Sequence, residues 1–359
     1  MKIGICGYFS YRKADFGGQA VKTKNYKKEL IKHYGEQSVI TIDTDCFSRH
    51  LIKNMWHFIC MYYQVDILLF MPTTKILKLL APVIAFLSFS RRMSVVYIVI
   101  GGWLPDYISH NKYLLRYLRK YAEIQVETIE MKVRLEEYGL KNVTVVPNFS
   151  TKKSLLDYED NQIRSMSPPP YRFCTFSRVK KEKGIKDAIL AVKSINEKYG
   201  KTICWLDVYG QIDNEFINEF EQLKEKYADC FEYKGIIDGD QAICQLSGYY
   251  ALLFPTYYQG EGFPGTLVEA FYAGIPVIAT NWKYNSEIVE HLTTGFIYSL
   301  DDENGLLDCM TQLICDPKKR EEMRAACLAE SLKYKPEYVL QSLFSIIDEV
   351  EKSKNIYEC

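Results

Sequence analysis

The amino-acid sequence predicts an α/β protein with two doubly wound, Rossmann-like domains. Short apolar runs alternate with stretches of helical periodicity along the chain, which is the pattern of parallel sheets wrapped on both faces by helices. The chain has 359 residues, more than one typical hydrophobic core organises, so two domains are expected. The prolines of Ser167–Pro170 can continue neither a helix nor a central strand, and they mark a linker.

We expect the first domain at residues 1–165, the second at 166–335, and a C-terminal segment at 336–359 whose helix covers Pro336–Val350. The expected strands of the first domain are Lys2–Cys6, Ser38–Ile42, Asp66–Phe70, Ser94–Ile100, Glu123–Val126 and Val143–Val146. Those of the second are a run from Tyr171, then Leu206–Tyr209, Phe231–Ile237, Ala251–Phe254 and Ile275–Ala279.

Composition predicts a cytoplasmic globular protein. Apolar residues make up 48% of the chain and charged residues 25%, which are ordinary globular values. The 11 cysteines include no C-x-x-C pair and no regular framework, which is typical of free thiols in a reducing compartment. No signal peptide is evident at the amino terminus, and the most apolar window, Leu79–Phe89, is too short to span a bilayer.

Charge is shared unevenly along the chain. Residues 1–150 contain 21 Lys or Arg and 12 Asp or Glu, a balance of +9, so the remainder of this neutral chain carries −9. A basic half suggests an anionic partner such as a membrane surface or a phosphorylated lipid, although ordinary surface variation is the alternative. Nucleic acid is not an expected partner, because no motif of a known binding module occurs. Three expected helices are apolar or aromatic with basic edges: one around Trp56, one at Leu77–Phe89 and one at Tyr113–Tyr121. Each of them can either lie on a membrane surface or pack against the core with its basic face in solvent.

The stretch Ala251–Thr280 reads as strand, glycine-rich loop, helix and strand. Pro264 occupies the expected first helical position, and Gly274 ends the helix. A helix that follows a glycine loop at the carboxyl end of a strand presents backbone N–H groups and the positive end of its dipole. The stretch therefore predicts an anion site suited to phosphate.

Two carboxylates, Glu261 and Glu269, flank this anion site, and the helical rise of about 1.5 Å per residue lets both face one crevice. Carboxylates accept hydrogen bonds from sugar hydroxyls, so a phosphorylated sugar fits the pair. The alternative is that each acid only complements the helix dipole. Gly260, Gly262 and Gly265 also satisfy G-x-G-x-x-G, but the proline within it and its distance from the amino terminus disfavour a dinucleotide fingerprint.

The segment EGFPGTLVEAFYAGIPVIAT resembles the glutamate-x7-glutamate signature of retaining GT-B glycosyltransferases, especially glycosyltransferase family four. The resemblance implies that Glu261 contacts hydroxyls of the donor sugar and that Glu269 holds the ribose of the nucleotide. It also implies that the helix start binds the donor phosphates, through Gly262, Phe263, Pro264, Gly265 and Thr266. In fold terms it implies two domains facing a cleft, with the C-terminal helix crossing back to the first domain.

Other segments match the same family. Arg178 and Lys183 resemble its Arg-x4-Lys-Gly, whose two cations neutralise the donor diphosphate, so both are expected to be catalytic together with Glu261. The glycine pair Gly17 and Gly18 follows the first strand, where a phosphate can approach closely. Further donor-binding positions implied by the resemblance are Gly210, Ile236 and Glu287.

The sequence departs from the family after the strand that ends at Ile100. Gly101, Gly102 and Trp103 stand where many relatives have a histidine near the reacting centre. Asp106, His110 and the backbone of Gly102 are the candidates to replace it.

The resemblance implies a nucleoside-diphosphate sugar, a UDP-sugar, as donor and a carbohydrate or lipid-linked acceptor bound by the first domain. Transfer is expected to proceed with retention, without metal or other cofactor, in cell-surface polysaccharide or glycolipid synthesis at the inner membrane face. The alternatives are a nucleotide-sugar epimerase of similar shape and a non-catalytic nucleotide-sugar-binding protein. Two D-x-D triplets, Asp43–Asp45 and Asp238–Asp240, are of the kind that occurs by chance in a chain of this composition, and we expect no metal site at them.

Overall fold

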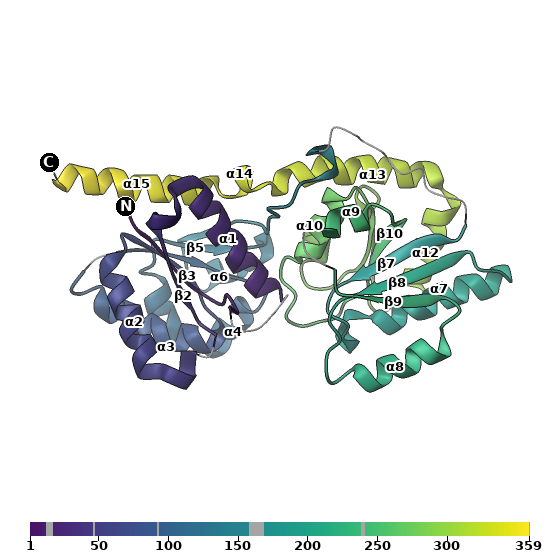
Figure 1. The fold of residues 1–359 in the computed structure, drawn as a ribbon, viewed down its shortest axis with the longest axis horizontal. Coiled ribbons are helices and arrows are strands. Elements are labelled where there is room, and N and C mark those ends of the chain that lie inside the picture. The colour runs from purple at the N-terminus through teal and green to yellow at the C-terminus, as the bar shows by residue number, and fades with distance from the viewer. Residues whose placement is uncertain (12–16, 46, 92, 158–168, 238–240, 359) are drawn as a thin grey trace. The chain divides into compact units, whose positions relative to one another are not determined.

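The computed structural model contains two parallel six-stranded sheets with helices between the strands, which confirms the predicted fold class (Figure 1). It describes residues 1–11, 17–45, 47–91, 93–157, 169–237 and 241–358. The chain divides into two compact units, Met1–Thr151 with Pro336–Cys359, and Lys152–Lys335. No helix among the described residues is both long and apolar enough to cross a membrane.

The first unit is built on a parallel sheet with the strand order β2-β1-β3-β4-β5-β6. Its strands are β1 Ile3–Gly7, β2 Val39–Asp43, β3 Ile67–Met71, β4 Ser94–Ile98, β5 Glu123–Val126 and β6 Val143–Val145. Its helices are α1 Gly18–Tyr34, α2 Leu51–Gln64, α3 Thr74–Leu87, α4 Leu104–His110, α5 Leu115–Leu118 and α6 Ile129–Glu137. The central strands β1 and β3 are buried along their whole length, because helices cover both faces of a parallel sheet.

The C-terminal segment belongs to the first unit, but it is not the single helix expected at Pro336–Val350. It forms α14, Pro336–Val339, and α15, Gln341–Glu358, which therefore runs past Val350. Leu343 and Ile347 of α15 are buried in the core of the first unit. This apolar contact draws the chain end onto the first sheet, a packing effect that helix propensity alone does not reveal.

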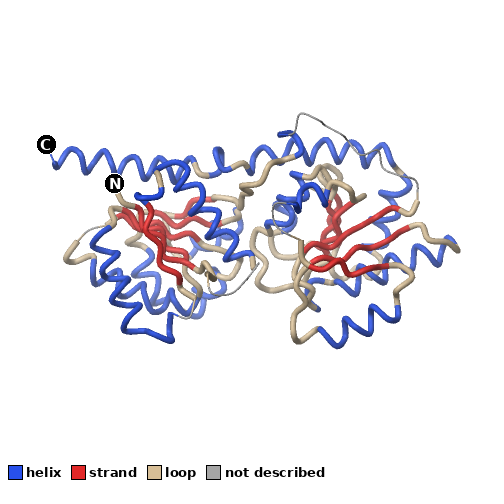
Figure 2. Tube along the Cα trace, viewed as in Figure 1, coloured by secondary structure: helices blue, strands red, loops and turns tan. Residues whose placement is uncertain are grey.

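The second unit has a parallel sheet with the order β12-β11-β10-β7-β8-β9. Its strands are β7 Tyr171–Phe176, β8 Cys204–Tyr209, β9 Phe231–Gly235, β10 Ala251–Phe254, β11 Val277–Thr280 and β12 Gly295–Tyr298. Its helices are α7 Ile185–Tyr199, α8 Ile217–Lys226, α9 Ala242–Leu246, α10 Gly265–Tyr272, α11 Asn285–Ile288, α12 Gly305–Cys315 and α13 Pro317–Ser331. Figure 2 shows helices along this sheet, and two core clusters pack between helices and strands.

Two features of the second unit differ from the sequence-based expectation. The edge strand β12 was not expected, because it is short and starts at a glycine. Gly295 packs closely on the neighbouring strand, since a Cβ there would lie 1.9 Å from the carbonyl oxygen of Val277. The division between the units falls at Thr151 rather than after residue 165, since Ser154 Oγ donates to the carbonyl of Tyr272 at 3.3 Å. Ser167 and Pro168 of the expected linker lie outside the described residues.

A buried ion pair joins α1 to the carboxyl edge of the first sheet. Lys22 Nζ of α1 lies 2.6 Å from Glu127 Oε1, directly after β5, and both side chains are buried. The other oxygen of Glu127 accepts the N–H of Gly101, in the loop after β4, at 3.0 Å. This pair therefore anchors the loop that contains Gly101 and Gly102.

We predict that Glu127→Gln lowers the free energy of unfolding by about 3–5 kcal/mol, because it leaves the ammonium of Lys22 buried without its counter-charge. The double variant Lys22→Met, Glu127→Met should recover most of this loss. Calorimetric melting measures both. The matched control is Lys132→Met, which breaks the exposed pair with Glu136 and should shift the melting temperature little. A Glu127→Gln protein that melts like the wild type would contradict the buried pair.

Candidate functional site

The residues expected to bind the donor follow the carboxyl ends of neighbouring strands in the second sheet. Arg178 follows β7, Gly210 follows β8, Ile236 follows β9 and Glu261 lies in the loop after β10. Because β7, β8, β9 and β10 are parallel, their carboxyl ends meet at one edge of the sheet. Ligands of doubly wound sheets bind at this edge.

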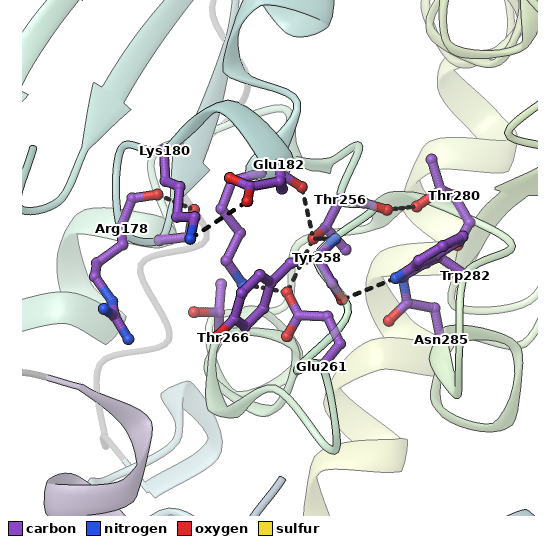
Figure 3. Close-up of polar contacts among 12 residues, drawn as sticks. Arg178, Lys180, Glu182, Thr256, Tyr258, Glu261, Thr266, Thr280, Trp282 and Asn285 are labelled. Atoms are coloured by element: carbon purple, nitrogen blue, oxygen red, sulfur yellow. Dashed lines mark hydrogen bonds and ion pairs between the residues drawn. The ribbon is translucent and has the colours of Figure 1, made fainter. Parts of the chain in front are cut away.

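Lys183 and Glu261 form a buried ion pair at this edge (Figure 3). Lys183 Nζ donates to Glu261 Oε1, and the exposed fractions of the two side chains are 14% and 7%. The same ammonium lies over the rings of Phe254 and Tyr258, at 5.6 and 5.0 Å from their centroids. A cation held against aromatic faces and away from water interacts strongly with any anion that enters.

Thr256 supports the carboxylate of Glu261. Its hydroxyl donates to Glu261 Oε1 at 2.9 Å, and its carbonyl accepts from Thr280 Oγ1 at 2.5 Å. Trp282 Nε1 donates to the carbonyl of Tyr258 at 2.8 Å. In Figure 3 the hydroxyl of Thr256 lies beside Glu261, and Thr280 and Trp282 bond to the backbone of Thr256 and Tyr258 in the same loop. The loops therefore hold Glu261 in one position.

Gly184 makes the close approach of the lysine loop possible. It has φ +69°, and a Cβ at this position would lie 2.1 Å from the carbonyl oxygen of Pro255, which follows β10. Only glycine combines this left-handed backbone with such a contact. The glycine after Lys183 is thus what lets the loop after β7 pack against the end of β10.

Helix α10 begins beside the ion pair, one residue later than expected. Pro264 is its N-cap rather than its first helical residue, and the helix starts at Gly265. Thr266 Oγ1 donates to the carbonyl of Phe176 at 2.7 Å, which ties the helix start to the end of β7. The positive end of the α10 dipole therefore lies at the same sheet edge as Lys183.

Phe263 does not offer its side chain to a ligand. The ring is buried and packs against Tyr334 with 5.5 Å between centroids. Of the expected donor-binding residues between Gly262 and Thr266, this one therefore contributes only its backbone at the site.

Glu269 is paired with Lys152, a residue that the sequence analysis did not single out. Lys152 Nζ donates to Glu269 Oε1, and both side chains are largely buried. Burial raises the pKa of Glu269, whereas the charge and hydrogen bond of Lys152 act to lower it. No local pattern in the sequence marks Lys152, because its partner lies far along the chain in another element.

Arg178 is exposed, unlike Lys183. In Figure 3 its guanidinium points away from Glu261. The structure thus brings together Lys183 and Glu261 but not all the expected catalytic residues. Gly210 has φ +132°, and a Cβ there would lie 1.7 Å from the carbonyl oxygen of Ser177. This backbone packing accounts for the glycine at position 210. Ile236 is exposed.

The remaining candidates lie outside the segments that carry Lys183 and Glu261. In the first unit, Gly17 is the N-cap of α1 and Gly18 its first residue, while Asp106 pairs with Arg134 and His110 ends α4. In the second unit, Glu287 is exposed on α11. None of these positions by itself identifies a role.

The D-x-D triplet at Asp43–Asp45 closes a loop. The carboxylate of Asp43 accepts hydrogen bonds from the backbone N–H groups of Phe9 and Tyr11 at 3.0 Å each. It also accepts one from the backbone N–H of Asp45 at 2.9 Å. These contacts give Asp43 a structural role at the end of β2. The second triplet, Asp238–Asp240, lies outside the described residues.

Comparison with known proteins assigns a domain type to the second unit. Residues 157–327 match the family described as glycosyl transferases group 1, so the chain carries a domain of this kind. A 2-deoxystreptamine N-acetyl-D-glucosaminyltransferase of Niallia circulans is 29% identical over 94 residues, which cover 26% of this chain and 24% of that relative. The matched region thus spans about a quarter of the relative.

Solved structures resemble the whole chain. Anabaena HepE in complex with UDP gives a TM-score of 0.75 at 16% identity and covers 97% of this chain and 100% of its own. Sucrose-phosphate synthase from Thermosynechococcus elongatus gives 0.76 at 15% identity, over 98% and 99% of the two chains. These likenesses confirm the GT-B fold with two Rossmann-like domains.

We predict that Gly184→Ala lowers the free energy of unfolding by about 2–5 kcal/mol, because it adds both a strained left-handed residue and an overlap with Pro255. Gly200→Ala is the matched control: Gly200 has φ +65° at the other end of α7 but no atom of another residue within 4 Å of its Cβ position. Its loss should be about 1–2 kcal/mol. Equal losses in thermal melting would contradict the close contact.

Proposed function

We propose that this chain is a retaining glycosyltransferase that moves a sugar from a nucleoside-diphosphate sugar, a UDP-sugar, to an acceptor hydroxyl. It acts without metal or other cofactor, in the synthesis of a cell-surface polysaccharide or glycolipid. The observation that carries the proposal is the buried pair of Lys183 and Glu261 beside the start of α10, within the unit that matches the glycosyl transferases group 1 family.

The donor diphosphate binds at the start of α10. The helix supplies backbone N–H groups and its positive dipole end, and Lys183 supplies a cation largely shielded from water. Arg178, which is exposed at the end of β7, turns toward the diphosphate when the donor binds. With these positive groups in place, the charge that develops on the departing diphosphate is stabilised by the protein.

The sugar and the ribose bind to the two carboxylates. Glu261, fixed by Thr256 and Lys183, accepts hydrogen bonds from hydroxyls of the transferred sugar. Glu269 accepts hydrogen bonds from the ribose. HepE, which shares the fold, has been crystallised with UDP-glucose, and this supports a UDP-sugar as the donor class.

The reaction is a front-face displacement. The bond from the acceptor oxygen to the anomeric carbon forms as the bond from that carbon to the diphosphate oxygen breaks, and the acceptor proton passes to the departing diphosphate. The configuration is retained because attack and departure use the same face of the sugar. This route requires no basic side chain at Gly101–Trp103, where the sequence departs from the family.

The acceptor, a carbohydrate or a lipid-linked sugar, is bound by the first unit. This unit, residues 1–151 and 336–359, contains 23 Lys or Arg and 17 Asp or Glu, and its positive balance of +6 suits an acceptor that carries phosphate or resides at an anionic membrane. We therefore place the enzyme in the cytoplasm, working at the inner membrane face.

We predict that Lys183→Ala and Arg178→Ala each lower kcat by about a hundredfold or more, since both cations meet charge that grows as the glycosidic bond breaks. Glu261→Gln should also lower kcat, because the sugar it contacts becomes cationic. Glu269→Gln should instead raise the donor KM with a smaller change in kcat, because a ribose contact exists equally before and during reaction. Steady-state kinetics with chelator present measures all four, alongside thermal melting.

The matched control is Lys180→Ala, a cation of the same loop that lies over the ring of Tyr258 and pairs with Glu182. It should leave the kinetics near normal. Four near-normal site variants with unchanged melting would end the site assignment, and loss of activity on chelation would contradict metal-independent transfer. Epimerisation of the donor sugar in the absence of an acceptor would favour an epimerase. Binding of the donor without release of UDP would favour a non-catalytic binding protein.

We predict that Lys152→Met shifts the acid limb of donor binding to higher pH. Burial raises the pKa of Glu269 and Lys152 opposes this rise, so removal of the lysine lets the pKa rise further. The protonated carboxyl loses accepting capacity toward the ribose, and the donor KM should therefore increase at a higher pH than in the wild type. Lys152→Arg keeps the positive charge and should restore the wild-type profile. Identical pH profiles of the wild type and Lys152→Met would rule out this role for Lys152.

A further inference from the structure

Helix α2 carries an apolar stripe on the face opposite its buried one. Phe58, Met61 and Tyr62 of this helix are buried. Ile52 and Trp56, one turn apart, have exposed fractions of 89% and 65%, and Tyr63, two turns further, is also exposed. Residues at these spacings share one side of a helix. An amphipathic surface helix normally places charged residues there, so the stripe calls for an explanation.

Helix α3 and the turn after it repeat this arrangement. Leu77, Leu80 and Ile84 are buried, whereas Phe86 and Phe89 have exposed fractions of 74% and 84%. Monomeric soluble proteins rarely expose several large apolar side chains together without a partner.

The ends of α2 and α3 lie side by side. Tyr63 Oη and Ser90 Oγ are 2.6 Å apart, and Tyr62 Oη donates to the carbonyl of Arg91 at 3.0 Å. Figure 1 shows the two helices adjacent on the first unit. We call their exposed apolar residues the α2–α3 surface, which comprises Ile52, Trp56, Tyr63, Phe86 and Phe89.

The charge around the α2–α3 surface is positive. Asp66 is the only acid in the sequence between Asp45 and Asp106. It is already occupied: it accepts the backbone N–H of Lys2 at 2.7 Å, and Lys354 Nζ lies 3.2 Å from its carboxylate. The same span of sequence contains Arg49, Lys53, Lys75, Lys78, Arg91 and Arg92.

Several of these cations flank the apolar residues. Arg49 and Lys53 are exposed at the start of α2, and Lys75 and Lys78 are exposed at the start of α3. At the other end, Lys120 Nζ lies over the ring of Phe89, 5.6 Å from its centroid. The surface thus combines large apolar side chains with a border of basic ones.

We propose that the α2–α3 surface docks on an anionic membrane. Aromatic and aliphatic side chains enter the boundary between headgroups and acyl chains, and the surrounding Lys and Arg residues contact acidic lipid headgroups. A second copy of the chain is disfavoured as occupant, because pairing this surface with itself would bring like charges together. The proposal concerns the first unit, whereas the ion pair of Lys183 and Glu261 belongs to the second, and it is independent of sugar transfer.

The test is co-sedimentation of the full chain with vesicles of phosphatidylcholine, with and without phosphatidylglycerol, at low and high salt and without donor or acceptor. The wild type should bind the anionic vesicles at low salt and lose most of this binding at high salt. The paired variants Ile52→Ser, Trp56→Ser and Phe86→Ser, Phe89→Ser should each reduce the partition coefficient about tenfold or more. Lys53→Gln should reduce it about fivefold at low salt.

The matched control is the pair Val133→Ser, Tyr338→Ser, which removes two exposed apolar side chains of the same unit outside the surface. It should bind vesicles like the wild type, and all variants should melt like it. Trp56 fluorescence should also shift to shorter wavelength on anionic vesicles, and Trp56→Phe should remove that shift.

Three outcomes would overturn the proposal. The first is absence of wild-type binding to anionic vesicles, and the second is equal binding to neutral ones. The third is a wild-type dimer in sedimentation equilibrium that Ile52→Ser, Trp56→Ser converts to monomer without any change in vesicle binding, which would make the surface an interface between copies. None of these results bears on the kinetics of the site variants, so the proposed sugar transfer and the proposed membrane docking fail separately.

Discussion

The burial of one ion pair, Lys183 with Glu261, is the constraint on which the candidate site depends. Removal of two charges from water is costly, and a buried pair often stabilises a fold no more than apolar residues would. Its cost is offset here by the hydroxyl of Thr256 and by the rings of Phe254 and Tyr258. The pair lies at the edge where parallel strands end, which is where ligands of doubly wound sheets bind.

The surrounding structure is arranged to keep the pair in place. Gly184 lets the loop after β7 reach the end of β10, and the hydroxyl of Thr266 fixes the start of α10 to β7. Thr280 at the end of β11 and Trp282 in the loop after it add two more hydrogen bonds. Connections after three strands of one sheet are therefore tied together around a single cation, carboxylate and helix start.

Local patterns predicted much of this fold. Apolar runs located both sheets, because a strand buried on both faces is apolar throughout, as in β10 and β11. The sequence did not predict the edge strand β12, because this short strand begins with a glycine. It also did not predict that α15 extends past Val350, because that extension depends on packing against the first sheet. Both misses arise where tertiary contact outweighs local pattern.

The candidate site was predicted in the same uneven way. The spaced motifs gave Lys183 and Glu261, which the structure places together, whereas Lys152 and Thr256 carry no motif. Lys152 contacts a residue 117 positions along the chain, and the contact of Thr256 depends on the fold of the loop after β10, so only the folded chain reveals them. The exposed position of Arg178 likewise could not be read from its spacing to Lys183, since that spacing says nothing about the direction of the side chain.

The most direct test of the central claim is a crystal structure of the full chain grown with UDP. The account predicts the diphosphate at the first turn of α10 within hydrogen-bond distance of Lys183 Nζ, and the ribose hydroxyls at the carboxylate of Glu269. Well-ordered UDP bound elsewhere, with Lys183 and Glu261 still paired and no phosphate at α10, would contradict it.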